Sequence, residues 1–434
     1  MSTLKVNKLR DTSGSTDAIT LDPNGGAVLA GVTTISTARI TTGITTSIQV
    51  GGGVTITESG IEASGIGITC ANLNGGQFGR RNKVINGAMQ IAQRSTSVAS
   101  ITSGNYYVCD RWRLGYGTAG TWTLSQSTDT PDNFGKSLKM DCTSANTSLS
   151  AGSNLQLIQF FEGQDLQDIQ KGTSSAREIT VSFYVKTNKT GTYVVELMDH
   201  DNSNRHCSKS YTVSDTNWNR YTLTFPADTT GALDDDANKS FEVGFWLVAG
   251  GTFQGSSLRQ TWGTLSQGSR AVGQVNLADS TSNEWYLTGV QLEVGSQATA
   301  FEYHSFGEEL ALCQRYYETS YPTGYSAGHN FNDVYPFNTS KPISQNYIAS
   351  DDTTTAISYP LMVNKRANPT VTIYSAKDGT SGQAWTYKGT GGTNANDALN
   401  VIQTREQSMM LGCSLGAVNQ ASEKYFHYTA DSEL

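Results

Sequence analysis

Two tryptophans have polar neighbours that could help them to bind a sugar. Trp262 is in "GGTFQGSSLRQTWGTLSQGS", beside Arg259 and Gln260, and Trp385 is in "SGQAWTYKG", beside Tyr387. Sugars are recognised by aromatic faces flanked by amide and charged groups in grooves or on loops. We therefore predict that these residues bind a ligand, and ordinary packing is the alternative for each tryptophan.

Carboxylates gather at Asp234, Asp235 and Asp236, in an expected hairpin loop. Two carboxylates about 5 to 9.5 Å apart in a groove could cleave a glycosidic bond, and oxygen ligands of this kind also suit Ca²⁺. The spacing fits no EF-hand, so a solvated loop is the simplest interpretation and calcium the weaker one. No G-x-S-x-G or H-E-x-x-H motif occurs, and we predict that the protein is not an enzyme.

The segment "DHDNSNRHC", from Asp199 to Cys207, contains two histidines and a cysteine. Its spacing fits no standard zinc site, and a plain polar hairpin is the preferred interpretation. The six cysteines are scattered without a C-x-x-C pair. We predict no bound metal and no cofactor.

The composition favours short strands and turns. Hydrophobic residues make up 37% and charged residues 16%, with 44 glycines and a net charge of −8. An acidic chain of this kind is not expected to bind nucleic acid. The start has no apolar signal-peptide core and no segment is long and apolar enough for membrane insertion, so we expect assembly in a cytoplasm.

Residues 77–304 show repeated period-two alternation, and we expect a jelly-roll β-sandwich there. In one strand Ile179, Val181, Phe183 and Val185 share a face. Trp246 lies off the face that neighbouring core residues occupy, which would expose it.

The sandwich is expected to close in the stretch from Tyr286 to Glu318. Trp285 and Leu287 share one face, and a β-bulge at Gly289 would restore the register for the residues that follow. Ser305 and Glu308 form a capping box that opens a short linking helix over 305–318. Its apolar stripe would consist of Leu310, Cys313 and Tyr317.

The two ends of the chain are also predicted to be mainly β. Residues 1–29 form an attachment segment, and residues 319–434 form a second, small C-terminal β domain. Residues 30–76 are rich in Ile, Val, Thr and Gly, with β-branched positions at Ile35, Ile40 and Ile44. Because so short a ribbon cannot bury its apolar face alone, we predict an intertwined, trimeric β shaft; a disordered linker is the alternative.

Several segments together resemble a known group of proteins. "NKVINGAMQIAQRSTSV", "DRWRL", "EITVSFYVKTNKTGTYVVEL" and the stretch from Tyr286 to Glu318 are, in this order, similar to bacteriophage tail-fibre and receptor-binding proteins. Those of marine viruses, including cyanophages, are the most similar, and the resemblance covers residues 78–320. The sandwich also resembles jelly-roll carbohydrate-binding modules, although fold alone does not establish ligand binding.

The resemblance implies a homotrimeric virion fibre. Its N-terminus would attach to a phage tail, baseplate or adaptor protein, and its other end would contact host-surface polysaccharide or lipopolysaccharide. A glycan-degrading tailspike and a head fibre or adaptor without receptor contact are the alternatives.

Overall fold

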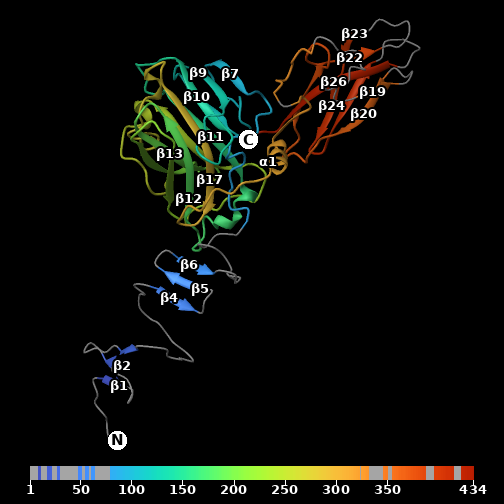
Figure 1. Cartoon of the computed structure of the whole chain (residues 1–434). Coiled ribbons are helices and arrows are strands. Elements are labelled where there is room, and N and C mark those ends of the chain that lie inside the picture. The colour runs from blue at the N-terminus through green and yellow to red at the C-terminus, as the bar shows by residue number, and fades with distance from the viewer. Residues whose placement is uncertain are drawn as a thin grey trace. The chain divides into compact units, whose positions relative to one another are not determined.

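The structure is a computed structural model. It describes residues 79–322, 324–331, 346–349, 354–387, 395–414 and 422–434, and short strands between residues 8 and 63. The chain divides into two units, Met1–Ala71 and Asn72–Leu434. The second unit contains a β-sandwich and the C-terminal sheets (Figure 1).

The described parts of the first unit are two small antiparallel sheets. One consists of β1 (Lys8–Arg10), β2 (Asp17–Leu21) and β3 (Ala27–Leu29), and the other of β4 (Ser47–Val50), β5 (Val54–Thr57) and β6 (Gly60–Ala63). Ile48 of β4 pairs with Ile56 of β5 within the same chain. Ile35, Ile40 and Ile44 of the predicted shaft lie outside the described residues, so the trimeric shaft stays a prediction.

Residues 79–322, all of which are described, contain a sandwich of two antiparallel sheets. The first has the order β15 (Asn219–Phe225), β12 (Ile179–Thr187), β17 (Glu284–Val294), β10 (Ser137–Ser144), β9 (Thr121–Ser127) and β7 (Ser97–Ile101). The second has the order β14 (Arg205–Val213), β13 (Gly191–Asp199), β16 (Lys239–Ala249), β11 (Asn154–Glu162) and β8 (Arg113–Gly117). The predicted mainly β fold with a jelly-roll sandwich is confirmed.

The sandwich core follows the predicted alternation of β12. Its four apolar residues on the predicted face are all buried, at Ile179, Val181, Phe183 and Val185. The ring of Phe183 packs edge-on against Phe245 of the facing sheet, with their centroids 5.0 Å apart. Trp122 and Trp285 of the first sheet, and Trp112 just before β8, complete the core.

Trp246 corrects one expectation, because its side chain is fully buried although it points away from this core. The loop after β16 covers the outer face of the second sheet. This loop contains the short 3-10 helices η3 (Gly251–Phe253) and η4 (Gln267–Ser269). The ring of Phe253 lies 5.0 Å from that of Trp246, and Arg270 from the same loop binds the buried carboxylate of Glu196 at 2.7 Å.

The predicted bulge at Gly289 is confirmed. Ser182 of β12 pairs with Gln291 of β17, whereas Tyr184 pairs with Thr288, so β17 contains one extra residue. Gly289 has φ +61°, a conformation that glycine adopts without strain.

Outside the strands, three further 3-10 helices are η1 (Gly163–Asp165), η2 (Gln167–Ile169) and η5 (Leu277–Asp279). Among the described residues the one α-helix is α1 (Phe306–Gln314). Both halves of the capping box between Ser305 and Glu308 are present. None of the helices in the part of the chain that is described has the length and apolar character needed to cross a bilayer.

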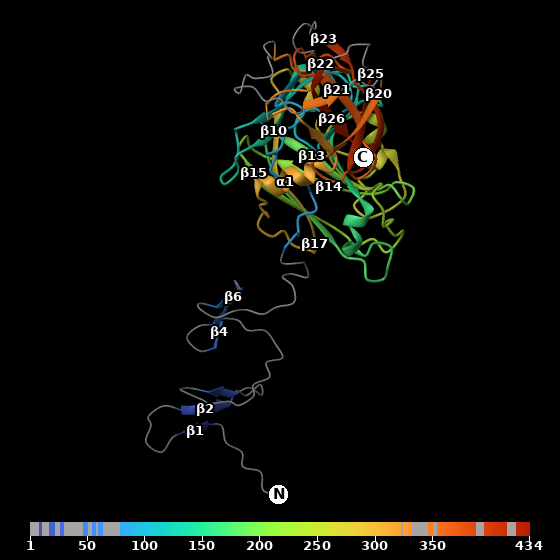
Figure 2. The same cartoon turned by 90° about the vertical axis from the view of Figure 1, so that its right-hand side faces the viewer.

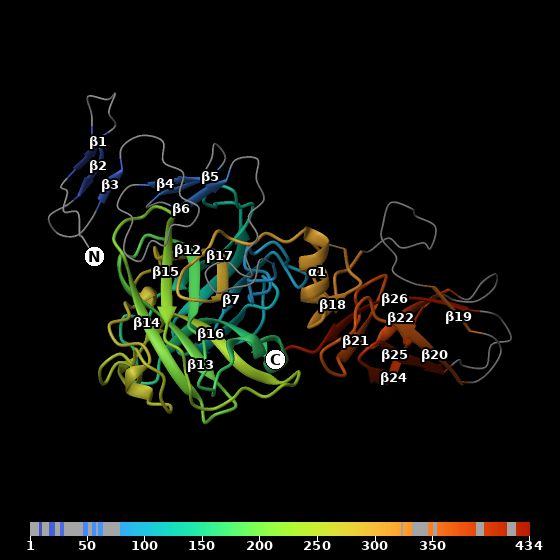
Figure 3. The same ribbon diagram turned by 90° about the horizontal axis from the view of Figure 1, so that it is seen from below.

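Helix α1 is shorter than the predicted 305–318. Cys313 is buried as expected, but Tyr317 belongs to β18 (Tyr317–Thr319), which pairs with the final strand β26 (Ser422–Asp431). Because Tyr317 is paired as a strand residue, the helix ends before it. Figures 1 and 3 both show α1 between the sandwich and the C-terminal strands.

Buried charges join the C-terminal sheets to the sandwich. Glu162 at the end of β11 accepts two hydrogen bonds from Arg315, at 2.7 and 2.6 Å, and one from the hydroxyl of Tyr316 at 2.5 Å. Arg111 of the sandwich forms an ion pair with Glu433, and its guanidinium lies 3.4 Å from the ring centroid of Tyr316. The stretch after the sandwich is therefore a structural join.

The C-terminal strands have their own core. One sheet follows the order β18, β26, β22 (Gln383–Tyr387) and β23 (Ala395–Ala398), and β19 (Asn346–Ala349) and β21 (Thr370–Ser375) also pair with β26. The other sheet is β20 (Thr354–Pro360), β25 (Ser408–Ser414) and β24 (Asn400–Arg405). Figure 2 looks onto these strands. Buried side chains between them include Ile373, Met409, Leu411 and Phe426.

Candidate functional site

Trp262, the first predicted ligand-binding residue, makes packing contacts with the fold. Its indole donates a hydrogen bond to the carbonyl oxygen of Pro226 at 2.7 Å, and its ring packs 5.8 Å from that of Phe241. Arg259 is half-buried and its backbone pairs with Ser208, while Gln260 is exposed. The contacts of Trp262 help to anchor its loop, and its role in ligand binding stays a prediction.

Trp385, the second predicted platform, is half-buried in β22. The ammonium group of Lys377 lies 3.9 Å from the centroid of its ring, so one face of the indole is in contact with a cation. Tyr387 ends the same strand and pairs with Glu423 through the backbone. These positions also stay predictions.

The acidic triplet Asp234, Asp235 and Asp236 lies in a loop at the surface. Asp234 and Asp235 are exposed, and Asp236 accepts hydrogen bonds from Asn238 in the next turn. Within the described residues, no three His, Cys, Asp or Glu side chains are arranged to hold a metal ion. The weak calcium candidate therefore has no support from the geometry.

The candidate metal ligands in "DHDNSNRHC" likewise contact different partners. Asp199 forms an ion pair with Lys171. His200 contacts Glu242 at 2.8 Å, and the ring of His206 lies 3.0 Å from the buried carboxylate of Glu196. The segment stabilises the edge of the second sheet.

A polar and aromatic site lies at one end of the six-stranded sheet, on its outer face. A pocket of about 380 Å³ opens where β12 ends and where β15 and β17 begin. It is lined by Lys186, Asn188, Thr216, Asn217, Trp218 and Glu284. We call these six residues, together with the adjoining Tyr286 and Asp129, the sheet-end site.

Tyr286 is the centre of the sheet-end site. It alternates with the core residues Trp285 and Leu287 and so points to the outer face, where its neighbours leave only 6% of it exposed. The ring of Trp218 packs edge-on against it, with centroids 6.1 Å apart and planes at 67°. The ammonium groups of Lys139 and Lys186 lie 5.5 and 5.6 Å from its centroid.

Hydrogen bonds hold these side chains in place. Asp129 accepts from the indole nitrogen of Trp218 at 2.9 Å and from Lys186 at 2.6 Å. Glu284 accepts from the hydroxyl of Tyr286 at 3.0 Å and pairs with Lys139 at 2.9 Å. The aromatic wall of the pocket is thereby oriented before any ligand arrives, which lowers the entropic cost of binding.

The pKa shifts agree with this arrangement. The hydrogen bond from Lys186 lowers the pKa of Asp129, so the carboxylate stays ionised in mild acid. Burial and the hydrogen bond to Glu284 raise the pKa of Tyr286, which keeps its hydroxyl protonated as a donor. Burial lowers the pKa of Lys139, but the hydrogen bond to Glu284 and the nearby Tyr286 and Asp141 together outweigh it, so the net shift is upward.

The remaining lining residues are available to a ligand. Thr216 and Asn217 are exposed, and neither side chain makes a hydrogen bond to another described residue. A hydroxyl and an amide next to an indole can bind the hydroxyls and the apolar face of a sugar ring.

Part of the same sheet face is covered. Phe134 packs against Tyr184 of β12 at 5.3 Å, and Phe301 and Tyr303 complete this aromatic cluster at 5.2 and 5.5 Å from Phe134. The cluster therefore covers the sheet around Tyr184, whereas the sheet-end site lies at the end of the sheet where Trp218 lies.

A larger cavity of about 610 Å³ lies beside α1, and three of its charged side chains serve the fold. Arg315 pairs with Glu162, Glu308 caps the helix, and Glu302 accepts from the backbone N–H of Asn82 at 2.8 Å. We assign this cavity to the structural join.

Two signals in the sequence could have indicated the sheet-end site. Trp218 lies between two asparagines in "TNWNRY", directly before a strand. The period-two alternation that places Trp285 and Leu287 in the core also places Tyr286 on the outer face of the sheet. What the sequence does not show is that β15, β12 and β17 are neighbours, which brings these residues together.

Comparison with known proteins gives similarity to solved structures only. The sequence matches no protein-family model and no curated protein. The enzymatically active domain of tailspike protein 4 of bacteriophage CBA120 is 14% identical, with a TM-score of 0.26, over 49% of this chain and 21% of that one. This chain thus spans about a fifth of the tailspike's length.

Two structures of carbohydrate-related proteins cover a similar share of this chain. A putative sugar binding protein from Bacteroides thetaiotaomicron is 12% identical, with a TM-score of 0.29, over 49% of this chain and all (100%) of that one. The CBM22-1 xylan-binding domain from Paenibacillus barcinonensis is 12% identical, with a TM-score of 0.24, over 48% of this chain and 100% of that domain. The sandwich architecture of the present chain is established by its own strand pairing.

Proposed function

We propose that this protein binds glycans through the sheet-end site. One observation carries the proposal: a pocket in which the indole of Trp218 is fixed by Asp129 and Tyr286 while the side chains of Thr216 and Asn217 remain unpaired among the described residues. An oriented aromatic wall with free polar groups suits a sugar ring.

The proposed setting is a virion, where the chain acts as a tail-fibre protein in host adsorption. Its N-terminal segment would attach to a tail, baseplate or adaptor protein, and its sandwich would contact host-surface polysaccharide or lipopolysaccharide. Three weak sites in a homotrimer would bind repeated surface glycans with greatly increased avidity. Deletion of residues 1–76 tests the assembly: a monomer in native mass measurement supports the shaft, and a persistent trimer moves the oligomer contacts to the globular domains.

Binding without catalysis is part of the proposal. A glycan-degrading tailspike would need two carboxylates flanking the bond that is cleaved. Incubation of the purified protein with bacterial capsular polysaccharides and O-polysaccharides separates the two functions. Retarded migration in affinity electrophoresis with unchanged polymer length supports a binder, and shortened polymer identifies an enzyme. A head fibre or adaptor without receptor contact would bind none of the polysaccharides.

Substitution of Trp218 tests the site itself. Trp218→Ala is expected to weaken retention of the bound polysaccharide about tenfold or more, because buried aromatic anchors dominate such contacts. Trp262→Ala and Trp385→Ala are the matched comparisons, since both are half-buried tryptophans in competing predicted sites. Weaker retention by Trp262→Ala or Trp385→Ala, with the retention by Trp218→Ala unchanged, would place the binding site at that tryptophan instead.

A further inference from the structure

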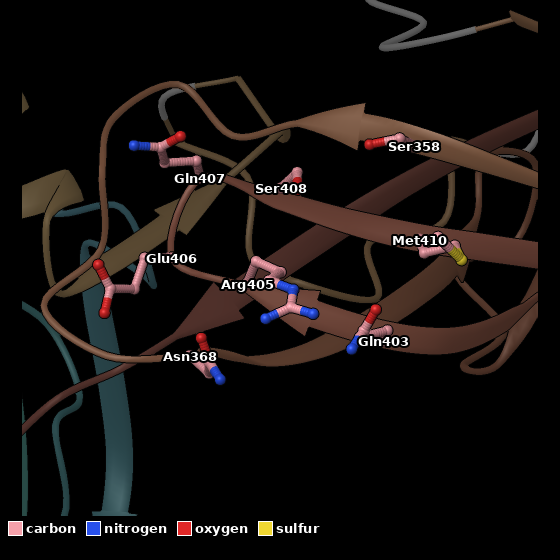
Figure 4. Close-up of a pocket in the computed structure, with 8 residues that line it drawn as sticks. All are labelled: Ser358, Asn368, Gln403, Arg405, Glu406, Gln407, Ser408 and Met410. Carbon is pink, nitrogen blue, oxygen red and sulfur yellow. The ribbon is translucent and has the colours of Figure 1, made fainter.

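A second polar pocket lies on the outer face of the small C-terminal sheet. It has a volume of about 460 Å³ and is built from β20, β24, β25 and the segment before β21 (Figure 4). Ligand pockets in proteins commonly measure about 300 to 1,000 Å³, so this one has room for one or two sugar rings. The sheet-end site lies on the sandwich, on different strands.

The alternation of β25 explains why this face is polar. Met409 and Leu411 are buried in the C-terminal core, so the alternate residues Ser408 and Met410 face outward. In β24 a register shift lies between Val401 and Gln403. Both Gln403 and Arg405 are exposed and line the pocket.

Three polar side chains in this pocket have no bonding partner in the described part of the chain. Among the described residues, the side chains of Arg405, Gln403 and Asn368 make no hydrogen bond and no ion pair. Nearby cations differ: Arg366 donates to the carbonyl oxygens of Ser432 and Glu433, and Lys365 is buried against a carboxylate. The pocket therefore offers a guanidinium and two amides to a ligand.

Figure 4 shows how these side chains are arranged. The guanidinium of Arg405 lies between the amides of Asn368 and Gln403, and the carboxylate of Glu406 lies to one side, on the turn that joins β24 to β25. The exposed thioether of Met410 provides an apolar surface at the other side.

A guanidinium is a planar fork that pairs with a carboxylate through two parallel hydrogen bonds. Amide groups on both sides can donate to and accept from ring hydroxyls. We propose that this pocket binds a uronic acid residue of an acidic polysaccharide, with its carboxylate on Arg405 and its hydroxyls on Asn368 and Gln403. The C-terminal β domain then selects acidic glycans independently of the sheet-end site.

The test uses the full-length protein with trigalacturonic acid as the probe and the neutral galactose trisaccharide as its uncharged counterpart. Calorimetry is expected to show at least tenfold tighter binding of the acidic trisaccharide, and the difference should shrink as salt is raised. Equal binding of both probes, or no binding of the acidic one, overturns the proposal.

Variants locate the binding. Arg405→Gln, at an exposed position, is expected to reduce affinity for the acidic trisaccharide about tenfold or more with unchanged melting temperature. Glu406→Gln removes a repelling charge and should strengthen it several-fold. Arg177→Gln, on the sandwich and likewise without a side-chain partner among described residues, is the matched control.

The outcomes separate this site from the sheet-end site. Trp218→Ala should leave the preference for the acidic probe intact, and Arg405→Gln should leave binding of neutral polysaccharide intact. If Trp218→Ala abolishes the preference or Arg405→Gln leaves it unchanged, the pocket is not the site.

Discussion

The indole nitrogen of Trp218 donates a hydrogen bond to Oδ1 of Asp129 at 2.9 Å, although the two residues are 89 positions apart in the chain. Lys186 binds the other oxygen of the same carboxylate at 2.6 Å. One side chain thus fixes both an aromatic wall and a cation of the sheet-end site. The site depends on the sheet that brings these segments together.

Asp129→Asn should disturb the site more than the fold. We expect less than about 1 kcal/mol of lost stability at neutral pH, because Asp129 and Lys186 are both partly exposed. Since the folded pKa of Asp129 is lowered, its contribution is present above the unfolded pKa and is lost as pH falls through the folded value. Urea unfolding at pH 7 and at pH 3 should show a small difference between wild type and variant that disappears in acid; a difference that grows in acid would contradict the assignment.

Gly289→Ala should destabilise the sandwich. Its φ is +61°, and an added Cβ would lie 2.7 Å from Cζ of Phe134 and 2.8 Å from the ring of Tyr184. Backbone strain and this overlap predict a loss of about 2 to 4 kcal/mol in denaturant unfolding. Gly152→Ala is the matched control, because a Cβ added there would meet nothing within 4 Å. Equal stability of both variants would show that the bulge tolerates a side chain.

His427 should make the C-terminal sheets sensitive to acid. It stacks on Tyr321 with ring centroids 4.1 Å apart, and burial lowers its pKa to about 4. The unfolded chain therefore binds the proton more tightly, so stability is full above about pH 6.5 and falls as pH drops towards 4. A shift of this size corresponds to about 3 kcal/mol.

His427→Phe removes the titrating group and should flatten this pH dependence. Thermal unfolding from pH 4 to pH 7 measures it. An unchanged slope in the variant would assign the acid sensitivity to other groups.

Glu162→Gln should weaken the join between the sandwich and the C-terminal sheets. Glu162 is fully buried and receives hydrogen bonds from Arg315 and Tyr316, so a neutral amide would leave the guanidinium with a poorer partner. We expect the variant's C-terminal sheets to unfold before the sandwich, by about 2 kcal/mol or more, in calorimetry. Glu284→Gln, a half-exposed carboxylate on the outer face, is the control and should leave a single transition.

Local patterns in the sequence predicted much of this fold. The alternation from Ile179 to Val185, the bulge at Gly289 and the capping box of Ser305 and Glu308 each depend on residues a few positions apart. Trp246 was assigned wrongly because its cover comes from the loop at Phe253 and Arg270. The predicted helix extends too far because Tyr317 pairs with β26, a strand more than a hundred residues later in the chain.

The sheet-end site was missed for the same reason. Trp218, Asp129 and Tyr286 come from three separate segments, and the strand order β15, β12, β17, β10, β9 brings them together. The sequence also does not show that Pro226 accepts the indole N–H of Trp262, so the contacts that hold this side chain could not be predicted.

The most direct test of glycan binding is affinity electrophoresis of wild type, Trp218→Phe and Trp218→Ala in gels that contain each polysaccharide of the panel. We expect that wild type is retarded by at least one polysaccharide, that Trp218→Phe keeps part of the retardation because an aromatic ring remains, and that Trp218→Ala loses it while its melting temperature shows a folded protein. Equal retardation of all three proteins, or none for wild type with any polysaccharide, would contradict glycan binding at the sheet-end site.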